Sequence, residues 1–318
     1  MIRLANFPPI LLFLSLGGAS EGANLDALDA KETEEGVLIT DGGQPVLFYQ
    51  RRTKSHQGKM PRANYIHPLY DLDGHALTED FPEDHLHHRG VFLGWHQLTV
   101  DGKPAGNPWR AEHMEFDVRD VEILSDDKNR LTLATHVWWR SHFLRESNGD
   151  PKPIVREKVR VRVGSVRDDI RPIDFDIRLQ AMVDGVRLGG SAGKKAYGGF
   201  TIRLGLPEDT RFTGEFGEVE PIETPLTAGR WMNLTGTFDS NTGLSGLTIL
   251  CHPDTPGKPR RWVLRRGRSM QNQVYPGRIP VPISTETPVR LRYRVLIHRG
   301  ELAPERIAEM LRQYGEDQ

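Results

Sequence analysis

Short segments in which apolar and polar residues alternate occur along most of the chain. In residues 155–163, VREKVRVRV, four valines and Glu157 fall on one face of an extended strand, and three arginines and Lys158 fall on the other. Residues 288–298 repeat the pattern, with Arg290, Arg292 and Arg294 on the outward face. A strand with one apolar and one charged face is half-buried, which is typical of an antiparallel sheet with one face in water.

Several other segments have the composition of strands, and turn dipeptides such as Asp73-Gly74 and Asn148-Gly149 separate them. The predicted strands are 36–40, 45–49, 91–95, 115–123, 131–139, 155–163, 170–183, 200–204, 247–251, 261–265 and 289–298. One helix is predicted at 304–314, with Pro304 at its first position and Gly315 as its terminator. The pattern therefore predicts an all-β protein, a large antiparallel β-sandwich with one C-terminal helix, formed as a single domain by residues 30–318.

The N-terminal residues have the layout of a secretory signal peptide. Arg3 precedes an apolar run at 10–16, and small residues follow at 17–20. We predict a signal peptide at residues 1–23 and a periplasmic or secreted protein. The apolar run is shorter than the ~20 residues that cross a bilayer, and no other segment is apolar enough, so we expect no membrane span in the mature chain.

Charge and cysteine content narrow the class of protein. The 318 residues include 42 Lys and Arg against 43 Asp and Glu, which gives no electrostatic reason to expect a nucleic acid partner. The basic run at 258–268 alternates with Trp262, Val263 and Leu264, so we interpret it as the wet face of a strand. The single cysteine, Cys251, cannot form an internal disulfide, and it follows an apolar run that predicts a buried, inert thiol.

Histidines are concentrated in one part of the chain. Seven of the 12 lie between His67 and His113, where even spacing would place about two. The densest segment, FPEDHLHHRGVFLGWH at 81–96, contains four of them. Imidazole serves as general acid, general base or metal ligand, and the neighbouring Arg89 offers a rigid fork of donors.

A metal and a sugar are both compatible with this segment. Zinc needs three or four ligands in a tetrahedral array, and the HLHH spacing is not one of the tight zinc patterns, so a divalent cofactor stays open. Sugar rings present flat C–H faces, and several aromatic residues lie nearby in the sequence or on predicted strands. They are Tyr65, Trp95, Trp109, Trp138 and Trp139.

Five segments together resemble a known family. They are HPLYDLDG at 67–74, DFPEDHLHHRG at 80–90, GGFTIRL at 198–204, LTILCHPDTPGKPRRWVLR at 247–265 and LRYRVLIHRG at 291–300. They resemble the PmoA family of bacterial proteins, which often carries a methane oxygenase label. The resemblance covers about residues 35–300 and implies a galactose-mutarotase-like β-supersandwich, a fold of sugar epimerases, glycosidases and polysaccharide lyases.

Fold analogy with these sugar-modifying proteins gives the candidate site. His87, His88 and His252 are the acid–base candidates, and the substrate-binding candidates are Arg89, His67, His96, Glu157 and Trp95. The first hypothesis is an exported carbohydrate-active enzyme, an epimerase, lyase or hydrolase, whose partner is a sugar or oligosaccharide. The second is a non-catalytic glycan-binding module. The third is a metal-dependent oxygenase, although di-iron centres draw on Glu-rich helical bundles and this chain has one predicted helix.

Overall fold

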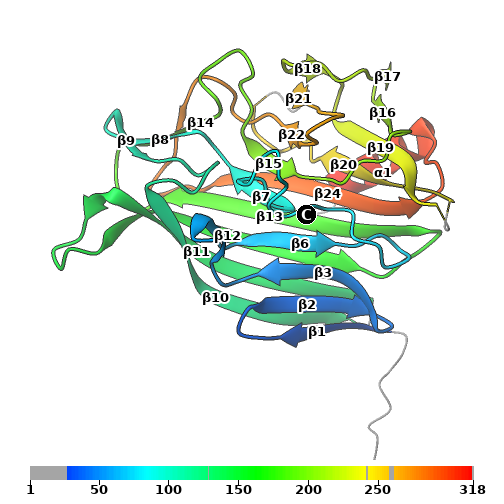
Figure 1. Cartoon of the computed structure of the whole chain (residues 1–318), viewed down its shortest axis with the longest axis horizontal. Coiled ribbons are helices and arrows are strands. Elements are labelled where there is room, and N and C mark those ends of the chain that lie inside the picture. The colour runs from blue at the N-terminus through cyan, green and yellow to red at the C-terminus, as the bar shows by residue number, and fades with distance from the viewer. Residues whose placement is uncertain (1–26, 128, 241–242, 258–260, 317–318) are drawn as a thin grey trace, which may run out of the picture.

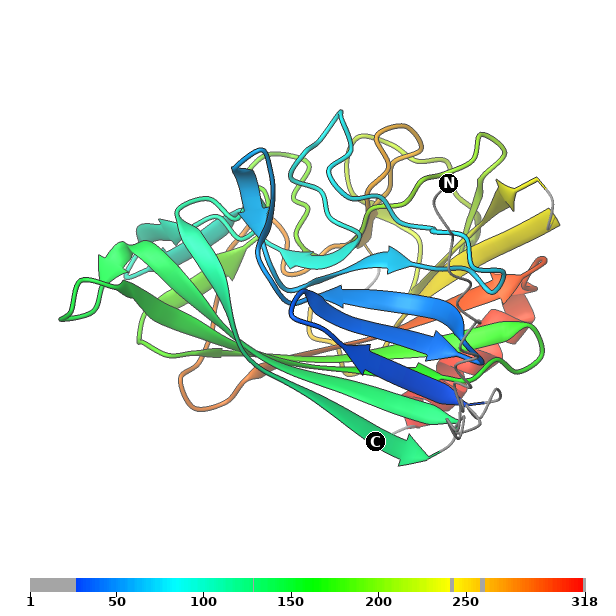
Figure 2. The same ribbon diagram turned by 60° about the horizontal axis from the view of Figure 1, so that its bottom comes forward.

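The computed structural model describes residues 27–127, 129–240, 243–257 and 261–316. Within them, two nine-stranded sheets lie face to face, and every pairing in both sheets is antiparallel (Figures 1 and 2). The all-β prediction with one C-terminal helix is confirmed, and each segment predicted as a strand overlaps a strand. The signal peptide predicted at 1–23 lies outside the described residues. No described helix has the length and hydropathy that a membrane crossing requires.

The first sheet contains the short strands on either side of the histidine-rich segment. In spatial order its strands are β1 (Leu28–Glu32), β2 (Gly36–Asp41), β3 (Gln44–Gln50), β6 (Tyr65–Leu69), β7 (Val91–Gly94), β15 (Gly199–Ile202), β22 (Gln271–Gln273), β21 (Arg261–Val263) and β18 (Leu226–Thr227). The order brings together segments that are far apart in the chain. Gly199 pairs with Gly94, and Thr201 pairs with Asn272.

The second sheet contains the long strands with alternating faces. In spatial order they are β10 (Met114–Asp127), β11 (Arg130–Arg145), β12 (Pro151–Gly164), β13 (Ile170–Ala181), β24 (Val289–Arg299), β20 (Gly243–Cys251), β19 (Trp231–Asp239), β16 (Arg211–Gly214) and β17 (Gly217–Glu218). In β12, Val159, Val161 and Val163 are buried and the arginines between them are exposed, as the alternation predicts.

Two smaller sheets complete the strands. A four-stranded sheet orders β23 (Val281–Pro282), β14 (Val186–Gly189), β8 (Gln97–Val100) and β9 (Lys103–Gly106), and a hairpin pairs β4 (Lys54–His56) with β5 (Lys59–Arg62). All six of these strands have only two to four residues, which is too short for a period-two pattern to be recognised in the sequence.

The main core fills the space between the two large sheets, and Cys251 is buried in it as predicted. A separate cluster lies on the outer face of the second sheet, where helix α1 (Pro304–Glu316) packs Ile307 and Leu311 against Leu250 and Leu296. The helix begins at the predicted proline. It continues through Gly315, so the prediction that this glycine ends it is wrong.

A third apolar cluster lies on the other face of the first sheet, opposite the main core. In β7, Val91 and Leu93 belong to the main core, and Phe92 between them packs with Trp109 and Met270 in the third cluster. Long loops coloured cyan, yellow-green and orange rise on the side of the first sheet that faces away from the second sheet (Figure 2). The histidine-rich segment is one of these loops.

Candidate functional site

The histidine-rich loop is closed at its neck by residues on either side of it. Asp80 and Arg89 form an isolated antiparallel bridge, and the Arg89 guanidinium donates to Asp80 Oδ1 over 3.0 Å. The residues just outside this bridge, Glu79 and Gly90, are also hydrogen-bonded, because the Gly90 amide donates to the Glu79 carbonyl over 2.9 Å. The loop is therefore held as a compact unit whose ends lie side by side.

Arg89 is part of this neck and does not line a cleft. The residue is 0% exposed, its guanidinium lies 3.2 Å from the centroid of the Phe81 ring, and it also donates to the Met60 carbonyl. Lys54 Nζ and the Tyr65 hydroxyl donate to the other oxygen of Asp80. The fork of donors that we predicted to anchor a substrate is occupied by the protein's own carboxylate and carbonyl groups.

Inside the loop the histidine rings pack against one another. The His85 and His88 rings are stacked, with centroids 4.7 Å apart and planes 8° from parallel, and the His87 ring meets the His88 ring edge-on at 4.6 Å. Trp109 packs against two of the histidines, because it meets the His88 ring edge-on and stacks on the His96 ring with centroids 5.2 Å apart. The turn that allows this packing is local, because the His88 amide donates to the His85 carbonyl.

Arg203, which directly follows β15, holds the loop from the sheet side. It is buried, and it donates to Glu79 Oε2 over 2.6 Å and to Asp84 Oδ1 over 2.9 Å. Its Nη1 also lies 3.4 Å from Nδ1 of His88. A guanidinium can only donate, so this contact favours the His88 tautomer in which Nε2 carries the proton. The sequence interpretation missed Arg203, although it lies in the quoted GGFTIRL segment.

The loop forms one wall of a cleft of about 210 Å³. Three of the predicted site residues, His87, His88 and His96, line it together. The other lining residues come from loops elsewhere in the chain: Arg110, Lys195, Tyr197, Glu223, Arg265, Gly267, Arg268 and Met270, along with His85. The expected tryptophan platform is absent from this lining, because Trp95, Trp109 and Trp139 are each 0% exposed. Tyr197 is the aromatic ring on this wall.

The cleft keeps three of its histidines, His87, His88 and His96, in the neutral form. Burial lowers the pKa of His87 to about 3, and Arg110 is the next cause. Burial, followed by the neighbouring His87 and His85, lowers the pKa of His88 to about 2, and burial with Arg110 lowers the pKa of His96 to about 4. At neutral pH each ring therefore has one nitrogen that can accept a proton or a hydrogen bond.

Two predicted substrate-binding residues lie away from the cleft, one in β6 and one directly after β7. His67 is half-buried in β6, and its Nδ1 lies 3.0 Å from the Thr78 hydroxyl. Trp95 is enclosed in the main core, where its Nε1 donates to the Tyr275 carbonyl over 2.8 Å. Neither residue lines the histidine cleft.

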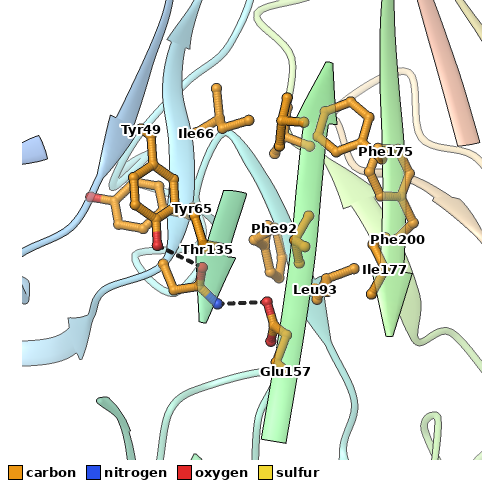
Figure 3. Close-up of a pocket in the computed structure, with 14 residues that line it drawn as sticks. Tyr49, Tyr65, Ile66, Phe92, Leu93, Thr135, Glu157, Phe175, Ile177 and Phe200 are labelled. Carbon is orange, nitrogen blue, oxygen red and sulfur yellow. Dashed lines mark hydrogen bonds between the residues drawn. The ribbon is translucent and has the colours of Figure 1, made fainter. Parts of the chain in front are cut away.

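Glu157 lies between the two large sheets, at the inward phase that the alternation predicts. Its carboxylate accepts from Asn64 Nδ2 over 2.7 Å and from Trp139 Nε1 over 2.8 Å, and Asn64 in turn accepts from the Tyr49 hydroxyl (Figure 3). Burial raises the pKa of Glu157. The adjoining cavity measures about 40 Å³, little more than the roughly 30 Å³ share of one water in the liquid, so it is too small for a sugar.

His252, the third acid–base candidate, is also outside the cleft. It is 1% exposed and lies beneath the end of α1, with Nε2 2.7 Å from Arg292 Nη1 and the ring edge-on to Tyr314. Burial and Arg292 lower its pKa. The convergence of His252 with the loop histidines, which the sequence interpretation expected, is not found, because His252 directly follows β20 of the second sheet, whereas the loop lies on the first sheet.

The loop histidines do not fit a metal site. The lone pairs of an imidazole lie in the ring plane, so the nearly parallel planes of His85 and His88 cannot both direct a lone pair at one ion between them. Across the described part of the chain, no group of three or more His, Cys, Asp or Glu residues is arranged to hold a metal. We therefore derive no step through a metal.

Two of the solved structures that are similar to this chain are distant from it. The putative mutarotase YeaD from Salmonella typhimurium is 11% identical, with a TM-score of 0.32, over 86% of this chain and 94% of that one. A TPR-domain containing protein from Parabacteroides distasonis is 11% identical, with a TM-score of 0.35, over 87% of this chain and 48% of that one. A search of curated proteins finds no match.

The fold and the cleft define an all-β protein of two large facing sheets, with a histidine loop on the outer face of one sheet. The chain belongs to the family of unknown function DUF6807, whose family model matches residues 36–312. This match contains the histidine loop and every other residue that lines the cleft.

Proposed function

We propose that this protein is an exported carbohydrate-active enzyme, an epimerase, lyase or hydrolase, that transfers protons at the histidine cleft. The supporting observation is that His87, His88 and His96 meet basic and aromatic side chains from three distant loops in one cleft. Such a wet concavity with a few convergent polar groups is the usual form of a small-molecule site. The resemblance to the PmoA family supports the sugar-modifying part of this proposal. The geometry of the site does not support the oxygenase label that this family carries, because the loop histidines do not fit a metal.

His87 is the acid–base group in this proposal. It is half-buried on the wall of the cleft, whereas His88 behind it is 4% exposed and in contact with Arg203. A neutral His87 has a ring nitrogen that accepts a proton from a sugar hydroxyl, or from a carbon next to a carbonyl or carboxylate, and its pKa of about 3 makes the protonated ring a strong acid that returns the proton. His88 packs edge-on against the His87 ring and is itself in contact with Arg203. Tyr197 offers a flat surface to the sugar.

The test is product formation from a panel of neutral and acidic glycans. His87→Ala is expected to lower turnover by about 10²–10⁴-fold, the usual contribution of a general acid or base. His142→Ala is the matched control, because His142 is a partly exposed histidine of β11 in the other sheet, and its turnover should equal that of the native protein. Unchanged turnover in His87→Ala would remove this residue from the mechanism. Glycans that bind without any product would identify a glycan-binding module.

A further inference from the structure

The cleft carries an excess of positive charge. Four of its lining side chains are cationic, Arg110, Lys195, Arg265 and Arg268, and only Glu223 is a carboxylate. Among the Arg, Lys and Glu side chains of the lining, the excess is three positive charges. The net charge of the whole chain is only −1, so the positive excess is local to the cleft.

The carboxylates near the cleft are already engaged by the protein. Glu223 lies 2.8 Å from Lys195 Nζ and 3.8 Å from Arg265 Nη2. Asp84, within the loop, is bound by Arg203. These contacts leave Arg110 and Arg268 as the cations with the weakest internal compensation.

Arg110 and Arg268 are exposed on the cleft wall. Arg110 reaches Glu112 only at 3.5 Å, and that carboxylate is itself 41% exposed. Within the described ranges, Arg268 has no side-chain hydrogen bond or ion pair. Its backbone is held in the left-handed region at φ 55°, a conformation that non-glycine residues rarely adopt and that is concentrated at functional sites. The lowered pKa of His87 reflects the same positive field, since Arg110 is its largest charged cause.

We infer that the cleft recognises a sugar bearing an anionic group, with Arg110 and Arg268 binding that group and His87 facing the sugar ring. This inference rests on the proposed function and gives its substrate class. A guanidinium fork matches the two oxygens of a carboxylate or of a phosphate ester, so the shared chemistry is an oxyanion attached to a sugar. A neutral sugar would offer these arginines only hydroxyl oxygens, and hydrogen bonds to a neutral hydroxyl are weaker than charge-assisted bonds to an oxyanion.

The experiment is calorimetric titration of the full chain with D-galacturonate, D-glucuronate, glucose 6-phosphate, glucose and galactose. We expect the anionic sugars to bind at least about tenfold more tightly than the neutral ones, because charge-assisted hydrogen bonds are the strong ones. Raising the salt concentration from 50 to 200 mM should weaken the binding of the anionic sugars and leave the binding of the neutral sugars unchanged. The uronates and the phosphate ester decide which oxyanion is preferred.

The double variant Arg110→Gln with Arg268→Gln should lose about tenfold or more in affinity for the anionic sugars and keep its affinity for neutral ones. Arg178→Gln is the matched control, since Arg178 is equally exposed but lies on β13 of the other sheet. Neutral sugars that bind or turn over as well as acidic ones would overturn this inference and leave the proposed function standing. Failure of every sugar to bind, with no product from the glycan panel, would overturn both.

Discussion

Arg203 connects the loop histidines to the first sheet through three contacts. It binds Glu79, which precedes the loop, and Asp84, which lies within it, and its Nη1 faces His88. Its own side chain is only 5% exposed, whereas the two carboxylates are 40% and 29% exposed. Arg203 is therefore a positioning residue, which orders the loop but does not face the cleft.

Replacing Arg203 with Gln is expected to lower the free energy of unfolding by about 1–3 kcal/mol. The value is below the range for a fully buried pair because both carboxylates can regain water. Urea unfolding measures it. Arg178→Gln, an exposed arginine of β13, should change stability by less than about 0.5 kcal/mol. Equal stabilities of the two variants would show that Arg203 does not hold the loop.

At the scale of elements, there is no room for a side chain where the histidine loop returns to the first sheet beside β6. Gly90 immediately precedes β7, and a Cβ at this position would lie 2.0 Å from the Ile66 carbonyl oxygen. Ile66 is the residue through which β6 pairs with Val91 of β7. A glycine is required here because the neighbouring atom is backbone and cannot rotate away.

Gly90→Ala should therefore force the two strands apart and lower the free energy of unfolding by about 1–3 kcal/mol, as overpacking does. Thermal and urea unfolding would show the loss. Gly267→Ala is the matched control. A Cβ there meets nothing within 4 Å, so its stability should stay within about 0.5 kcal/mol of the native protein. A fully stable Gly90→Ala protein would contradict the close approach of β6 and β7.

At the scale of the whole molecule, the buried neutral histidines couple folding to pH. Burial holds the pKa of His88 at about 2 and that of His298 at about 4, below the value of ~6.5 in an unfolded chain. Below pH 6.5 these histidines bind protons in the unfolded chain but not in the folded protein. Their contribution to the free energy of unfolding is therefore fully present above this pH and is lost as the pH falls. Glu157, with its raised pKa, acts in the opposite direction above pH ~4.5.

Comparison of variants isolates the contribution of one histidine. Between pH 6.5 and pH 5, the native protein should lose about 1–2 kcal/mol more stability than His88→Asn, because the variant lacks that ring in both states. Glu157 is present in both proteins, and its effect cancels. His142→Asn, changed at a partly exposed position, should lose as much as the native protein. Equal losses in the native protein and His88→Asn would show that His88 titrates normally in the folded state.

The sequence alone determined the main strands and their faces. Residues 155–163 alternate with a period of two, and this pattern depends only on the geometry of an extended backbone and on which side faces water. The close packing of the His87 and His88 rings also follows from neighbouring positions, since one turn brings them together, whereas their neutrality comes from burial in the folded protein. Strands of two to four residues, such as β22, carry too few positions for such a pattern.

Only the tertiary structure decided which residues share the cleft. Arg110, Lys195 and Arg268 come from loops that meet the histidines because β7, β15 and β22 are neighbours in one sheet. The same pairing places Arg203 behind His88, whereas His252 lies beneath α1 on the other sheet. Local alternation cannot encode these distances, because strand order depends on how the whole core packs and not on any one segment.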